Sequence, residues 1–185
     1  MNTKTSILAS LLSCSLLVDG FCGFSQPRAA MANLVDPKIL QTALELAEPL
    51  GGDYSYTYSG LTKGVAAKAI RDFKKIFKGD LGEKWYSLTD GYLVEFTHDS
   101  TKNVVMYDKK GNWSFTISYI DESRLAPSLK SLVESYYPGY NVTGAEEVSV
   151  SAFTFYVVHV QDKRTWKKLR IWDGEVDLIE DFNKE

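Results

Sequence analysis

The chain is poor in the residues that most often perform chemistry. Its two cysteines, Cys14 and Cys22, both lie within the first 25 residues. If that segment is removed, no thiol remains, which excludes disulfides, thiolate catalysis and cysteine-bound metals. The two histidines, His98 and His159, are far apart in the sequence, and a metal site needs three or four ligands. We therefore predict neither a metal nor a cofactor, and we expect both histidines to be structural.

Sequence motifs of catalysis are missing as well. The chain has no Gly-x-Ser-x-Gly elbow and no glycine-rich phosphate loop that opens a helix. The carboxylates Asp108, Asp173 and Glu175 fall in predicted turns, where an aspartate commonly bonds to its own backbone. Paired carboxylates can hydrolyse glycosides, so a hydrolase that uses these residues is one hypothesis. We nevertheless predict that the protein is not an enzyme.

The charge pattern argues against nucleic acid as a partner. The formal net charge is -3, and lysine and arginine do not gather in one dense cluster. Nucleic-acid binding usually needs such a cluster. Aromatic residues make up 13% of the chain, and tyrosine, the most frequent of them, suits half-buried positions because its ring is apolar and its hydroxyl is polar. The composition therefore favours a sheet-rich fold with exposed aromatic surface.

The first 25 residues have the pattern of an export signal. A positively charged start, Met1–Lys4, precedes an apolar run, Ser6–Val18, which is too short to span a membrane. Small residues at Gly23 and Ser25 suit a signal peptidase, so we predict a signal peptide at 1–25 and cleavage after Ser25. The mature protein would be periplasmic or secreted, without an integral membrane segment. A lipoprotein signal that uses Cys14 and an anchor helix that stays attached are the alternatives.

The most regular part of the mature chain runs from Tyr92 to Tyr119. Apolar and polar residues alternate in three short segments, which turns at His98–Ser100 and Asp108–Asn112 separate. Alternation of this kind predicts an antiparallel meander with one apolar and one polar face. Four further strands are predicted after Tyr140.

Three amphipathic helices are predicted around these strands. The first begins at Asp36-Pro37, an acceptor side chain followed by a proline in the first turn. The second covers roughly 65–77, and the third begins at Asp121–Ser123. Between the first two, a tyrosine-rich segment at 53–58 is predicted to be an edge strand or an ordered arm, with an aromatic contact strip as the functional alternative.

The segment after residue 60 divides into two similar units. Each unit has a helix and then strands, and each contains a turn in which an aromatic residue precedes an aspartate, at Tyr107-Asp108 and Trp172-Asp173. We predict an α+β fold in which two such units, 61–120 and 121–185, share one antiparallel sheet of about eight strands with the helices on one face. Residues 26–60 would form an N-terminal tail, a helix and the tyrosine-rich strand or arm.

The sequence resembles the PepSY-like, or β-lactamase-inhibitor-like (BLIP-like), domains of small exported bacterial proteins. The resemblance covers about two thirds of the chain, from Leu61 to Glu185, and rests on five segments: Ala69–Lys74, Trp85-Tyr86, Tyr92–Phe96, Tyr107–Trp113 and Arg170–Glu175. It implies a tandem helix-plus-four-strand fold, export and no enzyme activity. The inhibitor that gives the family its name acts on a hydrolase, but this chain has no inhibitory loop motif to carry over.

The strand around residue 170 predicts a binding surface. In a strand, Leu169 and Ile171 point to one face, whereas Trp166, Arg170 and Trp172 point to the other. If the apolar pair faces the helices, the other face is open, and Trp, Tyr and Arg dominate binding hot spots. By the same parity, three further predicted site residues join this open face: Glu95, Tyr107 and Tyr156. Asp177 would point outward too. The alternative is that these rings only cover the sheet.

Two functional hypotheses follow. The first is an exported, non-enzymatic binding module that uses the open sheet face for a protein or peptide of the cell envelope. An inhibitory or regulatory role is one form that such binding could take. The motivation is the stripe of Trp166, Arg170 and Trp172 together with the missing catalytic motifs. The second is a sensor or carrier of a small ligand, with an apolar pocket between the sheet and the helices.

Overall fold

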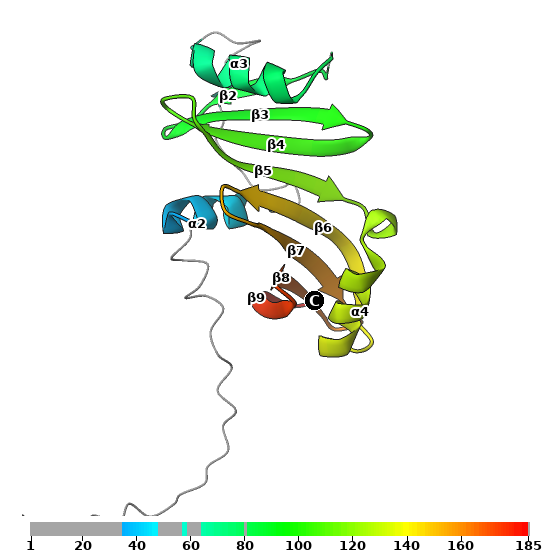
Figure 1. Ribbon diagram of the computed structural model, residues 1–185. Helices are drawn as coiled ribbons and strands as arrows, with labels where there is room; N and C mark the ends of the chain where they lie inside the picture. The colour runs from blue at the N-terminus through cyan, green and yellow to red at the C-terminus, as the bar shows by residue number, and fades with distance from the viewer. Residues whose placement is uncertain (1–34, 48–56, 59–63, 80, 185) are drawn as a thin grey trace, which may run out of the picture.

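A computed structural model describes residues 35–47, 57–58, 64–79 and 81–184 (Figure 1). The predicted signal peptide and residues 53–56 of the tyrosine-rich segment lie outside the described residues. The described helices are α2 (Pro37–Leu46), α3 (Ala67–Ile76), the 3-10 turn η1 (Glu122–Arg124) and α4 (Pro127–Tyr136). The strands are β1 (Thr57–Tyr58), β2 (Lys84–Ser87), β3 (Gly91–His98), β4 (Thr101–Asp108), β5 (Trp113–Ile120), β6 (Asn141–Val150), β7 (Thr154–Gln161), β8 (Thr165–Trp172) and β9 (Glu175–Asn183).

All nine described strands form one antiparallel sheet, in which the spatial order equals the sequence order. The predicted meander is confirmed: β3 pairs with β4 along its whole length, and β4 pairs with β5. The two-residue strand β1 lies at one edge, and β9 lies at the other. The fold is therefore α+β, as predicted, with one sheet as its framework.

Helix α3 covers the β2–β5 end of the sheet on one face. Its buried Phe73 makes edge-to-face contacts with Trp85 of β2 and Phe96 of β3, with ring centroids 5.5 and 5.0 Å apart. Val94 and Val105 complete this cluster. Burial of one such aromatic side chain stabilises the fold by roughly 2 kcal/mol. The helix forms because apolar residues recur at helical spacing on this side, whereas lysines occupy the other.

Helix α4 covers the same face at the β6–β9 end. Val133 of α4 packs against a cluster to which Val158 of β7 and both Leu169 and Ile171 of β8 contribute. The condition stated for the binding surface, that Leu169 and Ile171 face a helix, is therefore met. Figure 1 shows α3 and α4 toward opposite ends of the sheet. Each of these helices is followed by four strands, β2–β5 after α3 and β6–β9 after α4.

Helix α2 packs on the opposite face, so the prediction of helices on one face only is wrong. Ala43 and Leu46 belong to a cluster that contains Val104 of β4, Ile117 of β5 and Val157 of β7. The physical reason is visible in β4, where four consecutive apolar residues are buried and give both faces of the strand apolar surface. The predicted open face is thus covered by α2 at the middle of the sheet, while its β6–β9 end carries polar residues.

The start of the third helix also differs from the prediction. Residues Glu122–Arg124 form a separate 3-10 turn, and α4 starts only at Pro127. A residue that precedes proline avoids the helical region, and proline itself suits the first turn of a helix. Pro127 therefore separates the two elements.

Candidate functional site: the β6–β9 end of the α2 face

The predicted site residues divide between the two faces of the sheet. The strand register places Arg170 beside Val157, which packs in the cluster under α2, and places Asp177 beside Arg170. Trp166 and Trp172 share this face by alternation. Glu95, which pairs with Val104, lies on it at the other end of the sheet, where it accepts a hydrogen bond from the Tyr86 hydroxyl over 3.1 Å.

Two predicted site residues lie on the other face, and their assignment to the open face is wrong. Tyr107 is fully buried against α3 in the cluster of Phe73 and Trp85. Tyr156 packs against the α4 cluster, and its hydroxyl donates a hydrogen bond to Glu147 over 2.8 Å. Both tyrosines lie in apolar runs, Val104–Tyr107 and Phe155–Val158. In such runs, apolar–polar alternation does not indicate which face of the sheet a side chain occupies. Burial raises the pKa of both hydroxyls above the ordinary value.

The aromatic part of the site is a stacked pair on the last two strands. The rings of Trp166 on β8 and Phe182 on β9 are 4.3 Å apart and nearly parallel, at 19°. Both residues stay exposed, at 37% and 43%. Trp172, at the other end of β8, is half-buried and packs on Phe153, with ring centroids 5.2 Å apart. Of the two predicted tryptophans, only Trp166 therefore offers a ring to an incoming molecule.

Arg170 is held inside the sheet face. Its Nη2 and Nε atoms donate hydrogen bonds to the same Asp177 oxygen over 2.6 and 3.2 Å, and the side chain is 7% exposed. An arginine paired and buried in this way mainly fixes the packing of neighbouring strands, because separation from Asp177 would leave a buried guanidinium without its partner. Arg170 thus supports the surface, whereas the exposed aromatic ring lies four residues earlier along β8.

A row of buried polar side chains crosses this end of the sheet, and sequence reasoning did not include it in the site. Glu146 on β6 and His159 on β7 lie 2.8 Å apart, with side chains 5% and 11% exposed. Next to His159, the register places Lys168 on β8, which is 2% exposed and lies 3.8 Å from Glu180 on β9. The signal in the sequence was the alternation of Lys168 and Arg170 with buried apolar residues, which required anionic partners on the adjacent strands.

These residues border a groove between β6 and β8. It has a volume of about 380 Å³ and is lined by seven residues: Thr143, Gly144, Glu146, His159, Val160, Gln161 and Trp166. Its floor offers hydrogen-bonding groups, and one of its walls is the exposed indole. The register shift between Val142 and Gly144 lies in this part of β6. A bulge of this kind re-aims the side chains around it.

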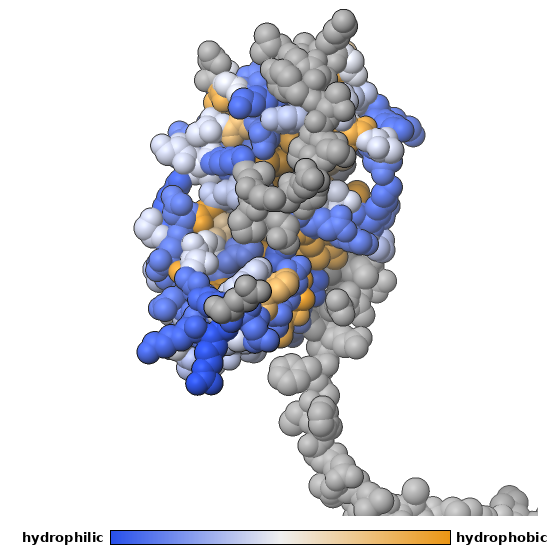
Figure 2. Space-filling view, turned by 180° about the vertical axis from the view of Figure 1, so that it is seen from behind, coloured by the Kyte–Doolittle hydropathy of each residue, from blue (hydrophilic) through white to orange (hydrophobic). Residues whose placement is uncertain are grey.

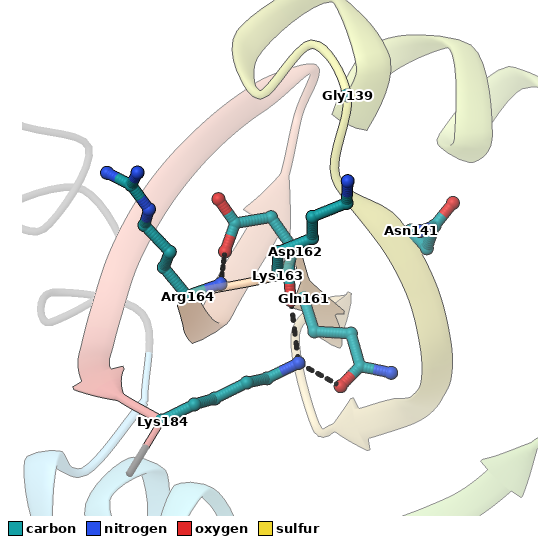
Figure 3. A pocket seen from close by; sticks show the side chains of 7 residues that line it. All are labelled: Gly139, Asn141, Gln161, Asp162, Lys163, Arg164 and Lys184. Atoms are coloured by element: carbon teal, nitrogen blue, oxygen red, sulfur yellow. Dashed lines mark hydrogen bonds between the residues drawn. The ribbon is translucent and has the colours of Figure 1, made fainter.

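A second, open pocket lies beyond the end of the groove, at the β7–β8 turn (Figure 3). Lys184 donates hydrogen bonds from Nζ to Gln161 Oε1 over 2.8 Å and to the Asp162 carbonyl over 2.6 Å. The amides of Thr165 and Arg164 donate to the Asp162 carboxylate and hold its pKa below the ordinary value. The polar groups at this turn thus serve to close the turn and to hold Lys184, which follows β9, against it.

The predicted turn carboxylate Asp108 has a similar local role. Its Oδ1 accepts hydrogen bonds from the amides of Lys110 and Asn112, each over 2.8 Å. His98 lies 3.5 Å from Asp99 at an exposed turn. Within the part of the chain that the structure describes, no three histidine, cysteine, aspartate or glutamate residues form a group that could hold a metal ion.

Comparison with known proteins identifies the fold of this chain but does not assign the chain to a family. No protein-family model matches the chain, and no curated protein matches it. Solved structures do match. A DUF2874 family protein from Bacteroides ovatus ATCC 8483 has a TM-score of 0.55 at 19% identity, with 64% of this chain and 87% of that chain covered. A BLIP-like protein from Bacteroides fragilis NCTC 9343 has a TM-score of 0.52 at 23% identity, over 64% and 86% of the two chains.

The fold is therefore BLIP-like. A third structure, of a protein from Bacteroides eggerthii DSM 20697 that is provisionally named as periplasmic, has a TM-score of 0.54 at 11% identity and covers 64% of this chain and 88% of that chain. At these identities the likeness establishes the fold alone. In the described ranges, the longest helices have ten residues, and none has the length and apolarity to cross a bilayer.

Proposed function

We propose that this protein is an exported, non-enzymatic binding module that takes a protein or peptide partner on the β6–β9 end of the α2 face. Residues 61–120 and 121–185 would be the two units of a PepSY-like tandem repeat, exported by the signal at 1–25. The observation that carries the proposal is the exposed Trp166–Phe182 stack beside a groove whose lining includes Glu146, His159 and Gln161. Exposed aromatic rings next to well-ordered polar groups are the composition of binding hot spots.

The polar side chains of this surface are already held in place by their partners, which supports the same proposal. Arg170 and Asp177, like Glu146 and His159, are paired before any partner arrives. A surface whose charged side chains are already fixed loses little conformational entropy when it binds. The groove lining also offers side-chain oxygens and nitrogens of Thr143 and Gln161, which suit the amides and carbonyls of a peptide.

The alternative of a small-ligand carrier has less support. A carrier of this kind would have an apolar pocket between the sheet and a helix. Where the structure describes those interfaces, buried side chains fill them in three clusters, one under each helix. The groove and the turn pocket are both open to solvent, and no residue of α2, α3 or α4 lines either of them.

Site-specific photo-crosslinking in the host envelope tests the proposal. A photoreactive phenylalanine analogue replaces Trp166 in one variant and Ile76 in the control, since Ile76 is an exposed apolar residue of α3, at 58%, far from the groove in the fold. We expect one protein or peptide to crosslink from position 166 and not from position 76. Crosslinks from position 76 alone, or equal crosslinks from both, would contradict the proposal. Crosslinks to a small metabolite would favour the carrier.

A further inference from the structure

The last strand, β9, forms one edge of the sheet. It pairs with β8 along one side, and no strand among the described residues pairs with its other side. Edge strands expose a row of backbone donors and acceptors that another extended chain can use. The β9 edge is nine residues long, which is long enough to bind a strand-length segment.

The turn that precedes β9 determines which amides point outward. Asp173 and Gly174 have φ angles of 52° and 78°, the values of a two-residue type I′ turn. Such a turn is closed by a hydrogen-bonded pair, here Trp172 and Glu175. Because hydrogen-bonded and non-hydrogen-bonded pairs alternate, Val176 and Leu178 direct their N–H and C=O groups away from β8, toward solvent.

Apolar side chains flank this edge on both faces. Leu178, which pairs with Leu169, lies on the α4 face and is 48% exposed. Phe182, stacked on Trp166, lies on the α2 face and is 43% exposed. An added strand would place alternate side chains on the two faces, so it would meet an apolar neighbour on each.

The charges of β9 determine what kind of segment fits. Asp177, Glu180 and Asp181 each have a basic partner on the β8 side, namely Arg170 at 2.6 Å, Lys168 at 3.8 Å and Lys167 at 2.5 Å. The three carboxylate side chains remain 33%, 35% and 47% exposed. Lysine or arginine on an added strand would continue the alternation of charge across the sheet. A second copy of β9 would instead place carboxylates beside carboxylates, which is unfavourable.

We propose that the β9 edge binds an extended segment of another protein in which basic residues alternate with apolar ones. The segment would add a tenth strand to the sheet through the outward groups of Val176 and Leu178. Its basic side chains would lie beside Asp177 and Glu180 on the α2 face, and its apolar side chains would lie beside Leu178 on the α4 face. The edge shares Phe182 with the groove surface, whereas Leu178 lies on the opposite face of the sheet, so substitution of Leu178 tests the edge by itself.

The test uses a ten-residue peptide that alternates lysine and valine. We expect it to bind and to slow hydrogen exchange at the amides of Val176 and Leu178 by at least tenfold. The same peptide with glutamate for lysine, and one N-methylated at alternate residues, should each bind at least tenfold more weakly. Leu178→Pro should have the same effect, because proline removes an outward donor and is tolerated on edge strands. Far-UV circular dichroism checks that this variant folds.

Three outcomes would overturn the proposal. Equal binding of the N-methylated peptide would mean that charge attraction alone holds it. Absence of binding by the lysine–valine peptide would show that the edge does not accept a strand. A dimer that Leu178→Pro dissociates would assign the edge to a second copy of the chain. Ile76→Ala on α3, at the other end of the sheet, serves as the control: it should leave peptide binding at the edge within about threefold of the parent value, an energy difference below 1 kcal/mol.

Discussion

His159 Nε2 and Glu146 Oε2 lie 2.8 Å apart across the β6–β7 pair, and both side chains are almost fully buried. They form the floor of the groove that Trp166 flanks. A buried polar pair of this kind orders the surface above it, because each partner satisfies the hydrogen-bonding requirement of the other. The groove therefore depends on a contact that the fold itself holds in place.

Glu146→Gln tests that dependence. The substitution keeps the size of the side chain but removes its charge, and we expect the free energy of unfolding to fall by about 2 kcal/mol. His159→Gln should cost a similar amount. The double variant should lose clearly less than the sum of the two, because each single change already weakens the shared contact. Urea unfolding of the four proteins measures this coupling, and strictly additive losses would contradict it.

Tyr107→Phe should leave the protein as stable as the parent or more stable, by up to about 1 kcal/mol. The Tyr107 hydroxyl is buried and has no hydrogen-bond partner among the described residues, and an unsatisfied buried hydroxyl costs free energy. Thermal unfolding measures the change. Since Tyr107 lies under α3, partner binding should not change either. A marked loss of stability would show that the hydroxyl has an important partner.

Tyr156 should make stability depend on alkaline pH. Burial, and then the hydrogen bond and charge of Glu147, raise the pKa of its hydroxyl to about 12, from an ordinary value of 10.0. The folded state thus favours the protonated form, so this contribution is fully present below pH 10 and is lost as the pH rises from 10 to 12. Urea unfolding across this window should show a steeper loss for the parent than for Tyr156→Phe. Parallel losses would contradict the assignment, since both proteins share all other tyrosines.

Gly144 offers a way to fill the groove without disturbing the core. A Cβ atom added at Gly144 would meet nothing within 4 Å, and the residue lines the groove. We expect Gly144→Phe to change the free energy of unfolding by less than about 1 kcal/mol and to block the partner.

Gly91→Ala is the contrasting case, because its Cβ would collide with the Tyr107 carbonyl oxygen. It should destabilise the protein by at least about 2 kcal/mol. Urea unfolding and the crosslinking assay measure the two effects.

Sequence reasoning predicted the parts of the fold that local patterns determine. The alternation around Leu169 and Ile171 correctly indicated the helix-facing side of β8, and the turns correctly divided the meander. It failed for Tyr107, because β4 is apolar on both faces, so alternation does not indicate which of its side chains point to which face. The position of α2 is a tertiary relationship, which helical periodicity does not encode: the pattern shows that a helix has an apolar face, but not which surface it covers.

The candidate site was predicted only in part for a related reason. Trp166 and Arg170 stood out because their residue types are common in hot spots. Glu146, Lys168 and Glu180 are ordinary surface residue types, and only the strand register brings them into one row with His159. The register also pairs Arg170 with Asp177, which moves the binding role from the arginine to the exposed tryptophan and the groove beside it.

The most direct test of the central claim is the affinity of the crosslinked partner for three proteins: the parent, Trp166→Ala and Ile76→Ala. Removal of a hot-spot tryptophan typically costs at least about 2 kcal/mol, or roughly 30-fold in Kd. We expect that loss for Trp166→Ala and a Kd within about twofold of the parent value for Ile76→Ala, with both variants unfolding near the parent midpoint. An unchanged Kd for a folded Trp166→Ala variant would contradict the claim that the partner binds at the groove.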